Sequence, residues 1–385
     1  MRIAIDARFY GEAGPGRYIK NILTHLEKLD TVNEYLVFMR KKSIDSYTPT
    51  NPKFKKILAD FTWYSFEEQI FFLAQIILFG PDLFYVPHFN VPIFYPGKMV
   101  TAIPDIIMHT FSTEQGTTLP KPYYRFKKFV YYFVVLLATL KSKKVIVASK
   151  ATLHDFRKSY PFINENKYIV CYEGVDPDLL RMLLGVESDP KTEESTKQVL
   201  TKFKITGPYL LYVSSMYKHK NVERLVDAFE ILKNKFGYKG QLVLAGKKDF
   251  FSKAIYDQVC RKNLSDFILM PGEDSYITDE EVTLLRKNAV AYVFPSLKEG
   301  FSLTPLEAMA CKLPCAISDI ECHREIFGDS VAFFDPMNIE DMASVMFKVT
   351  QDPELRSLLV LKGLELVEKY KWEDSAQITL DVFNS

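Results

Sequence analysis

Short apolar runs alternate with longer helical patterns along most of the chain, and this alternation limits the possible folds more than any other feature. In the first half we predict these buried strands: Arg2–Ile5, Tyr35–Met39, Leu83–Val86, Met99–Ile103, Val145–Ala148 and Tyr168–Cys171. The segments between them with helical patterns are Tyr18–Leu29, Trp63–Leu78 and Lys127–Leu140. Such alternation is typical of a parallel sheet with helices on both faces.

A second alternating series follows a polar, acidic stretch between about residues 181 and 197, which we predict to be a linker. Its predicted strands are Tyr209–Val213, Gln241–Ala245, Phe267–Met270, Ala289–Phe294, Pro314–Ile317 and Val331–Phe334. Its predicted helices are Val222–Phe236, Phe251–Lys262, Asp279–Lys287 and Ile339–Thr350. At 385 residues the chain exceeds the usual size of one domain. We therefore predict an α/β fold of two Rossmann-like, doubly wound domains that face one another across a ligand-binding cleft.

Composition excludes several other classes of protein. A formal net charge of +1 gives no overall field that would attract nucleic acid. The cysteines form no paired C-x-x-C set, so we interpret them as buried residues of a reducing compartment and expect no metal site. The first residues lack the pattern of a signal peptide, and the longest apolar run, Phe129–Leu140, is shorter than the ~20 residues that span a bilayer. We expect a cytoplasmic protein that is at most peripheral to the membrane.

The stretch Glu299–Ala310 has the strongest chemical signature in the chain. The predicted strand Ala289–Phe294 leads into it, and Gly300 permits a tight loop. Thr304 and Pro305 are typical of a helix N-cap followed by the first helical residue. A helix N-terminus presents unpaired N–H groups and a positive dipole end, which together attract phosphate.

Two carboxylates, Glu299 and Glu307, flank this loop. They can bind hydroxyl groups on whatever molecule carries the phosphate, which indicates a phosphorylated polyol such as a nucleotide sugar. Two simpler interpretations stay open. Thr304-x-x-Glu307 is also a capping box, in which Glu307 bonds the N–H of the cap residue. Glu299 can equally be a solvated residue at the end of a strand.

Two other turns follow predicted strands. Gly11–Arg17 lets backbone approach a ligand, but its G-x-x-G-x-G order differs from the dinucleotide fingerprint. Lys218–Asn221 follows the strand Tyr209–Val213, and its lysines can neutralise a diphosphate. A flexible glycine turn and a solvated basic turn remain as the alternatives. Because Lys218–Asn221 and Glu299 both follow strands of one predicted sheet, we expect them to converge on one ligand.

Taken together, these segments resemble the retaining nucleotide-sugar glycosyltransferases of family 4, glycosyl transferases group 1, which have the two-domain GT-B fold. The matching segments are Arg2–Asp6, Gly14–Tyr18, Tyr172–Asp176, Lys220–Asn221, Leu225–Phe229, Ala245–Gly246, the Glu-x7-Glu motif of Glu299 and Glu307, and Tyr370–Trp372. The resemblance covers nearly the whole length. It implies an acceptor-side domain over residues 1–190, a nucleotide-sugar-binding domain over 191–370, and a C-terminal helix, 371–385, that packs back on the first domain.

The resemblance also implies residue roles. The catalytic residues would be Lys220, which neutralises the leaving diphosphate, Glu299, which contacts hydroxyls of the donor sugar, and Asp105. The donor-binding residues would be Gly16, Arg17, Ser215, Lys218, His219, Lys220, Gly272, Glu299, Gly300, Phe301, Ser302, Leu303 and Glu307. Within this set Glu307 would bind the ribose, and Gly272 would border the base. No metal or other cofactor is expected, because lysine and helix dipoles can stabilise the developing charge.

The chain departs mildly from the family pattern at Ser302 and Thr304, where the family more commonly has glycine and proline, and more strongly at two other places. Where the family commonly has His-Asp, this chain has Pro104 before Asp105, with His109 four residues on. The usual arginine ahead of the lysine is also missing, since Ser215 and His219 occupy the two common positions. We therefore expect diphosphate binding to depend on Lys218 or His219 as well as on Lys220.

The predicted function is transfer of a hexose, with mannose favoured, from a GDP- or UDP-linked donor to a hydroxyl of a glycan or lipid-linked acceptor, with retention at the anomeric carbon. This reaction belongs to polysaccharide or glycoconjugate synthesis. Pro104 prompts one alternative, a catalytically weak sugar-nucleotide-binding partner of a glycan-assembly complex. A dinucleotide-dependent oxidoreductase is a further rival, which the glycine order disfavours.

Aromatic and basic residues mix in Tyr123–Lys128, just before the apolar part of a predicted helix. Such a mixture can hold a helix at an anionic membrane surface, so residues 121–140 are a candidate for peripheral membrane contact. The alternative is an ordinary core helix with a solvated basic start.

Overall fold

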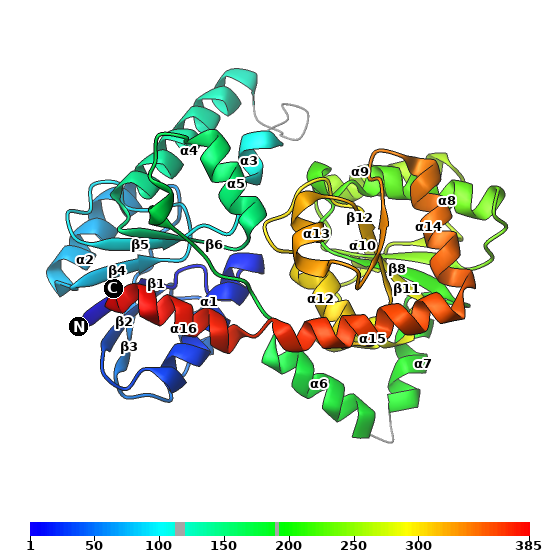
Figure 1. Ribbon diagram of the computed structural model, residues 1–385, viewed down its shortest axis with the longest axis horizontal. Coiled ribbons are helices and arrows are strands. Elements are labelled where there is room, and N and C mark those ends of the chain that lie inside the picture. The colour runs from blue at the N-terminus through cyan, green and yellow to red at the C-terminus, as the bar shows by residue number, and fades with distance from the viewer. Residues whose placement is uncertain (112–119, 189–191) are drawn as a thin grey trace. The chain divides into compact units, whose positions relative to one another are not determined.

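The computed structural model describes residues 1–111, 120–188 and 192–385. The chain divides into two compact units, one made of Met1–Glu173 with Lys371–Ser385 and the other of Gly174–Tyr370 (Figure 1). The first unit thus ends at Glu173 rather than near residue 190. Helix α6 (Pro177–Ser188) belongs to the second unit because it packs against α11 (Asp279–Asn288).

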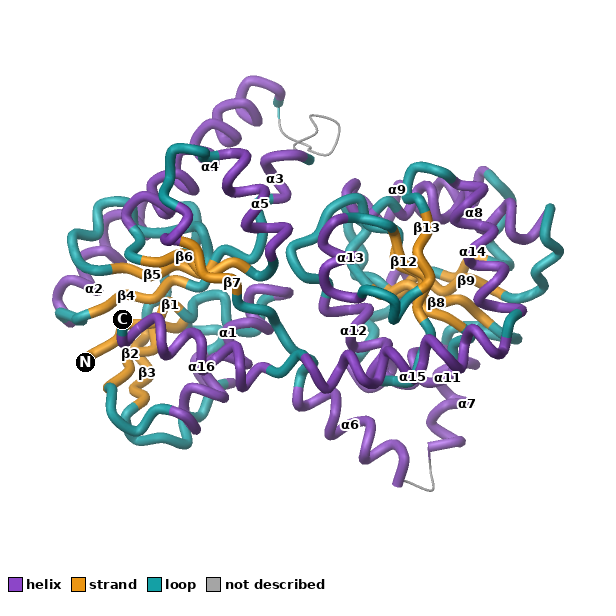
Figure 2. The backbone as a smooth tube through the Cα atoms, in the orientation of Figure 1, coloured by secondary structure: helices purple, strands orange, loops and turns teal. Residues whose placement is uncertain are grey.

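Each unit contains one parallel sheet, as the alternating pattern predicts, and its strands are orange in Figure 2. The strands of the first are β1 (Arg2–Asp6), β2 (Glu34–Met39), β3 (Phe54–Leu58), β4 (Leu83–Val86), β5 (Met99–Ala102), β6 (Lys144–Val147) and β7 (Tyr168–Val170). Their order is β3-β2-β1-β4-β5-β6-β7. The sequence did not predict β3, an edge strand that pairs with β2 and whose residues after Phe54 are partly or fully exposed.

The helices of the first unit cover this sheet. They are α1 (Ala13–Leu29), η2 (a π-helix, Glu68–Phe72), α2 (Leu73–Phe79), α3 (Ile107–Thr110), α4 (Lys121–Lys141), α5 (Lys150–Ser159) and α16 (Trp372–Asn384), with short 3-10 turns η1 (Ile44–Ser46) and η4 (Glu165–Lys167). Helix α16, red in Figure 1, packs against α1, with the Tyr18 and Trp372 rings 5.7 Å apart. Among the described residues, no helix has the length and apolarity needed to cross a membrane.

The first helix begins earlier than predicted, at Ala13 instead of Tyr18. Gly14 and Gly16 therefore lie in its first turns, and the predicted loop over Gly11–Arg17 is wrong for most of its length. A Cβ on Gly16 would lie 2.6 Å from the Phe9 carbonyl oxygen, so the helix start approaches the chain after β1 too closely for any larger residue.

The strands of the second unit are β8 (Tyr209–Val213), β9 (Gln241–Ala245), β10 (Ile268–Leu269), β11 (Ala291–Phe294), β12 (Cys315–Ser318) and β13 (Ala332–Phe334), in the order β10-β9-β8-β11-β12-β13. Its other helices are α7 (Thr192–Lys202), η5 (Lys218–Lys220), α8 (Val222–Asn234), α9 (Phe250–Arg261), α10 (Pro271–Asp274), α12 (Leu303–Ala310), α13 (Glu321–Phe327), α14 (Ile339–Gln351) and α15 (Pro353–Lys369). The predicted linker is largely helical, since α6 and α7 occupy it; residues 189–191 lie outside the described part of the chain.

Both sheets reverse their strand order once, between β1 and β4 in the first unit and between β8 and β11 in the second. In open parallel sheets, ligands bind beyond the carboxyl ends of the strands at such a reversal, because the connections diverge to opposite faces there. Each unit therefore has one edge position where the fold itself favours a site.

Candidate donor-binding site

Lys220 and Glu299 meet at the strand reversal of the second sheet. Lys220 ends η5, which follows β8, and Glu299 lies in the loop after β11, the neighbouring strand. The Lys220 Nζ donates to Glu299 Oε1 at 2.7 Å, and the two side chains are 13% and 8% exposed. Lys220 Nζ also lies 5.2 Å from the centre of the Phe294 ring. The fold thus places a cation and an anion together in a largely dry position.

The environment keeps Glu299 charged. Burial alone raises the pKa of this carboxyl, but the charge and hydrogen bond of Lys220 outweigh it, so the pKa lies below the usual value. The neighbouring His219 is in the opposite situation, because burial and the Lys220 charge lower its pKa to about 4. At neutral pH Glu299 is therefore an anion and His219 a neutral imidazole.

The loop after Glu299 enters α12 through an unusual backbone conformation. Ser302 is the N-cap residue and has a φ of 81°, in the left-handed region that non-glycine residues seldom adopt. Its hydroxyl makes no cap bond and lies 2.9 Å from His323 Nε2, while His323 Nδ1 lies 2.8 Å from the Ser318 carbonyl oxygen. The helix begins at Leu303, so the prediction that Thr304 caps it is wrong.

Glu307 is not part of a capping box, because Thr304 is inside the helix. It forms a buried ion pair with Arg286 Nη2 of α11. The sequence interpretation missed both Arg286 and His323. Each contacts a residue 21 positions away in the chain and belongs to no motif, so only the tertiary fold identifies them. The ribose-binding role of Glu307 stays a prediction.

Other predicted donor-binding residues have structural partners. Lys218 is exposed and pairs with Glu223, and the Ser215 carbonyl oxygen accepts a bond from Tyr212 Oη at 2.5 Å. The Phe301 ring is buried edge-on against Tyr370, with ring centres 5.4 Å apart. Phe301 therefore helps to pack the loop that carries Glu299, whereas Lys218 forms only an exposed ion pair.

Gly272 lies beyond the carboxyl end of β10, at the start of α10. A Cβ there would lie 1.7 Å from the Gly246 carbonyl oxygen, which no side chain can tolerate. The glycine therefore allows the turns after β9 and β10 to touch, and this packing brings the predicted base-binding residue to the same edge of the sheet as Lys220.

The predicted residues of the first unit lie at the carboxyl edge of its own sheet. Asp105 follows β5, and its Oδ1 accepts a bond from the Ile107 N–H at 3.0 Å. Both ring nitrogens of His109 have tyrosine partners, since they lie 3.0 Å from Tyr131 Oη and 2.9 Å from Tyr160 Oη.

Glu173 interacts electrostatically with Asp105 and Arg17. It belongs to one of the segments that resemble the family, but the resemblance gave it no role. Burial and the Asp105 charge raise the pKa of its carboxyl to about 7, although Arg17 lowers it. In the folded chain this group therefore holds a proton between about pH 4.5 and 7 that the unfolded chain has released.

Stability of the first unit should consequently fall as pH rises through that window, since unfolding releases a proton. Replacing Glu173 by Gln should remove this part of the pH dependence. The stability of the variant relative to the wild type should therefore be higher at pH 8 than at pH 5. Urea midpoints at the two pH values measure the effect. If the urea midpoint changed between pH 5 and pH 8 by the same amount in the variant as in the wild type, this would contradict a titrating Glu173.

Comparisons with known proteins identify the second unit. Residues 194–363 match the family model described as Glycosyl transferases group 1. The chain is 26% identical over 311 residues to O-antigen chain mannosyltransferase B of Escherichia coli, a match that covers 80% of this chain and 74% of that protein. It is 27% identical over 195 residues to the Escherichia coli serotype-specific mannosyltransferase WbdA, which covers 49% of this chain and only 23% of WbdA.

Solved structures give the same fold over the full length. WaaG, a glycosyltransferase involved in lipopolysaccharide biosynthesis, is similar over 99% of both chains, with a TM-score of 0.74 and 15% identity. Anabaena HepE, solved in complex with UDP and glucose, is similar over 100% of this chain and 99% of that chain, with a TM-score of 0.73 and 14% identity. The chain therefore carries a glycosyl transferases group 1 domain and is a glycosyltransferase with the GT-B fold.

Proposed function

We propose that this glycosyltransferase transfers a hexose, with mannose favoured, from a nucleoside-diphosphate sugar to a hydroxyl of a glycan or lipid-linked acceptor, with retention at the anomeric carbon. The observation that carries the proposal is the buried Lys220–Glu299 pair at the strand reversal of the second sheet. An anionic diphosphate with an attached polyol needs both a cation and an acceptor of hydroxyl hydrogen bonds. This pair supplies both within 2.7 Å.

The proposed step uses the charges in the following way. The acceptor hydroxyl oxygen forms a bond to the anomeric carbon, the bond from that carbon to the diphosphate oxygen breaks, and the hydroxyl proton passes to the leaving phosphate. Lys220 stabilises the negative charge that develops on the leaving group, and Glu299 orients the sugar through its hydroxyls. Preorganised charges in a dry site act strongly because they need no rearrangement during the reaction.

The relatives support the type of sugar and donor. Mannosyltransferase B and WbdA of Escherichia coli are named as mannosyltransferases, and HepE was crystallised with UDP and glucose. The choice of mannose and of a nucleotide donor for this chain is an extension from those proteins.

A screen of nucleotide sugars by thermal shift, followed by turnover of the best binder, tests the proposal. The true donor should raise the melting temperature, because a ligand that binds only the native state stabilises it. The NMR spectrum of the product should contain the anomeric configuration of the donor. Inversion would overturn the retaining route, and failure of every nucleotide sugar to bind would overturn the proposal.

The rival function is a sugar-nucleotide-binding partner with little catalysis of its own. Two observations favour it. Pro104 has no imidazole, and both ring nitrogens of His109 already contact tyrosine hydroxyls, so neither residue offers an imidazole to the reacting sugar. Donor that binds without measurable hydrolysis or transfer would favour this rival.

We further propose that the N-terminal half of α4 contacts an anionic membrane surface. Tyr123, Phe126, Phe129 and Phe133 are between 46% and 67% exposed on this helix, although Val135 and Ala138 further along are buried in the core. Arg125, Lys127 and Lys128 lie in the same half, so apolar and basic groups occur together. This arrangement fits an acceptor held on a lipid.

Co-sedimentation with vesicles that contain anionic lipid should recover the protein at low salt and lose it at high salt. Replacing Phe126 and Phe129 by Ser should reduce the bound fraction several-fold. The same change at Phe162, an exposed phenylalanine outside α4, is the control and should leave binding unchanged. Equal binding of the α4 variant and the control would contradict the membrane role.

A further inference from the structure

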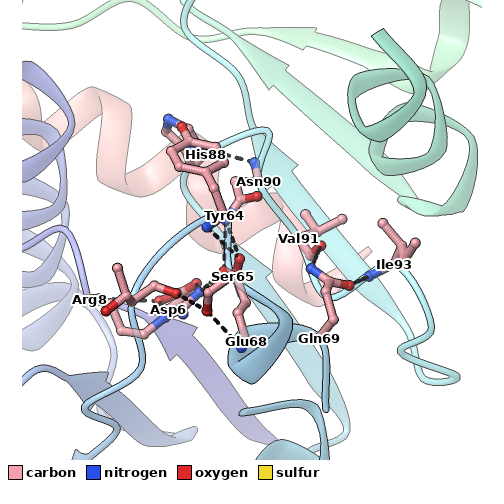
Figure 3. Close-up of polar contacts among 11 residues, drawn as sticks. Asp6, Arg8, Tyr64, Ser65, Glu68, Gln69, His88, Asn90, Val91 and Ile93 are labelled. Carbon is pink, nitrogen blue, oxygen red and sulfur yellow. Dashed lines mark hydrogen bonds and ion pairs between the residues drawn. The ribbon is translucent and has the colours of Figure 1, made fainter. Parts of the chain in front are cut away.

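The strand reversal of the first sheet holds a second group of polar and aromatic side chains. Asp6 ends β1, Arg8 and Phe9 follow it, and His88 and Asn90 follow β4, the neighbouring strand. Figure 3 shows Asp6, Arg8, His88 and Asn90 together with Glu68 of η2. This is the edge position where an open parallel sheet binds ligands, and neither the predicted site residues nor the donor site includes it.

A buried ion cluster fixes the base of this group. Arg8 is fully buried, and its Nε and Nη2 donate to the two Asp6 carboxylate oxygens at 2.8 and 2.7 Å. Arg8 Nη2 also donates to Glu68 Oε1 at 2.5 Å. The Asn90 amide donates to both Glu68 oxygens at 2.7 Å. The segment after β4 is therefore held to the segment after β1 through charged hydrogen bonds, as the dashed lines in Figure 3 indicate.

Asn90 in turn sets the state of His88. The Asn90 backbone N–H lies 3.0 Å from His88 Nδ1, and a backbone N–H can only donate, so Nδ1 must be the acceptor. Burial also lowers the pKa of His88 to about 4, so the ring is neutral at physiological pH. A neutral ring that accepts at Nδ1 carries its proton on Nε2.

The Nε2–H of His88 has no hydrogen-bond acceptor among the described residues. His88 is only 9% exposed, but its Nε2 atom is not fully enclosed and keeps some accessible surface. The His88 ring thus presents one N–H donor, in a fixed orientation, beside a cluster whose members are hydrogen-bonded to one another. A nearly buried donor without an acceptor reduces the stability of the fold unless water or a ligand accepts its hydrogen bond.

Aromatic rings lie next to the His88 ring. His88 stacks on Phe9 with ring centres 4.6 Å apart, Phe9 stacks on Trp63 at 4.1 Å, and Phe89 lies 4.2 Å from His88. Tyr64 is 64% exposed and has a φ of 59°. Sugars present apolar C–H faces and directed hydroxyls, so rings next to a fixed donor have the chemistry to recognise a pyranose.

We propose that His88 Nε2–H donates a hydrogen bond to a hydroxyl oxygen of the acceptor sugar, in a subsite bordered by Tyr64 and Phe89. This inference rests on the proposed function, since it names a residue that selects the acceptor of that reaction. Asp6, Arg8, Glu68 and Asn90 act through His88 as positioning residues. The donor sugar nucleotide does not enter this contact.

The first test compares His88→Ala with His88→Gln in the full chain. Loss of one hydrogen bond should raise the acceptor KM about tenfold in His88→Ala, with donor KM and donor hydrolysis unchanged. Gln carries an N–H at a similar distance from the backbone, so it should recover a large part of the lost affinity. His154→Ala, an exposed histidine on α5, is the matched control and should behave as the wild type.

A second measurement works without turnover. Saturation-transfer NMR with methyl α-mannopyranoside should give a signal in the wild type that weakens in His88→Ala and returns in His88→Gln. If no donor is ever turned over but this pattern holds, the proposed function falls and the sugar subsite stands. An unchanged acceptor KM and an unchanged NMR signal in His88→Ala would overturn the subsite, as would an equal rise of donor and acceptor KM in both variants.

Discussion

Replacing Lys220 by Ala should lower kcat for sugar transfer on the order of 10²–10³-fold, the loss expected when one preorganised charge donor is removed from a dry site. Two effects add in this variant. The leaving diphosphate loses its cation, and Glu299 remains buried without the partner that lies 2.7 Å away in the wild type. Steady-state kinetics with donor and acceptor varied separately measure the loss.

The same variant should change the pH profile. Lys220 is the main reason that the pKa of Glu299 lies below its usual value, because burial alone acts in the opposite direction. Without Lys220 the pKa of Glu299 should rise, so residual activity should begin to fall at a higher pH as the solution is acidified. Lys220→Arg keeps the charge and should keep the wild-type profile.

Lys235→Ala is a suitable control because Lys235 is an exposed lysine, directly after the last residue of α8, that pairs with Glu340. Its removal should change kcat less than about twofold, as expected for a solvated ion pair. Unchanged donor hydrolysis and transfer in both Lys220→Ala and Glu299→Ala would exclude a catalytic role for the pair.

Replacing Arg8 by Met should reduce the stability of the first unit by about 3–5 kcal/mol, the usual result of breaking a buried ion cluster from one side. Arg8 is fully buried and binds both Asp6 and Glu68, so its removal leaves two carboxylates without their cation. Met keeps much of the volume of the arginine stem and loses the guanidinium, whose carbon lies 3.8 Å from the centre of the Phe72 ring. The loss should therefore reflect charge more than packing.

Tryptophan fluorescence during urea unfolding measures this loss cleanly, because both tryptophans, Trp63 and Trp372, belong to the first unit. Arg157→Met is the matched control, since Arg157 forms an exposed pair with Glu165 at 3.0 Å and should cost less than about 1 kcal/mol. Neutralising Asp6 and Glu68 as Asn and Gln in the Arg8→Met background should recover part of the stability. A loss below about 1 kcal/mol in Arg8→Met would contradict this account.

The sequence predicted the central strands well because strands that are buried on both faces are continuous apolar runs. It failed at β3, where Lys55 and Lys56 interrupt the run, and these residues are compatible with an edge strand because one side remains open to water. It also failed at the segment after residue 181, whose acidic composition suggested a linker although α6 and α7 both find packing partners on α11. Local composition cannot report such partners.

For the site, the sequence predicted which residues would come together but not how they would be held. Lys220 and Glu299 converge because both follow neighbouring strands, a relation that the topology of parallel sheets determines. The left-handed Ser302 and its contact with His323 depend on a helix that arrives later in the chain. Glu307 could be taken for a capping residue because its partner, Arg286, lies 21 positions earlier in the chain on another helix.

The return of the chain to the first unit also determines the order in which the protein can be completed during synthesis. The second unit is one continuous segment, Gly174–Tyr370, whereas the first needs Lys371–Ser385 in addition to its first 173 residues. Until α16 leaves the ribosome, Tyr18 and Tyr85 lack their Trp372 and Phe383 neighbours. The unit that is translated first is therefore finished last, and the order usual for chains of successive domains is reversed.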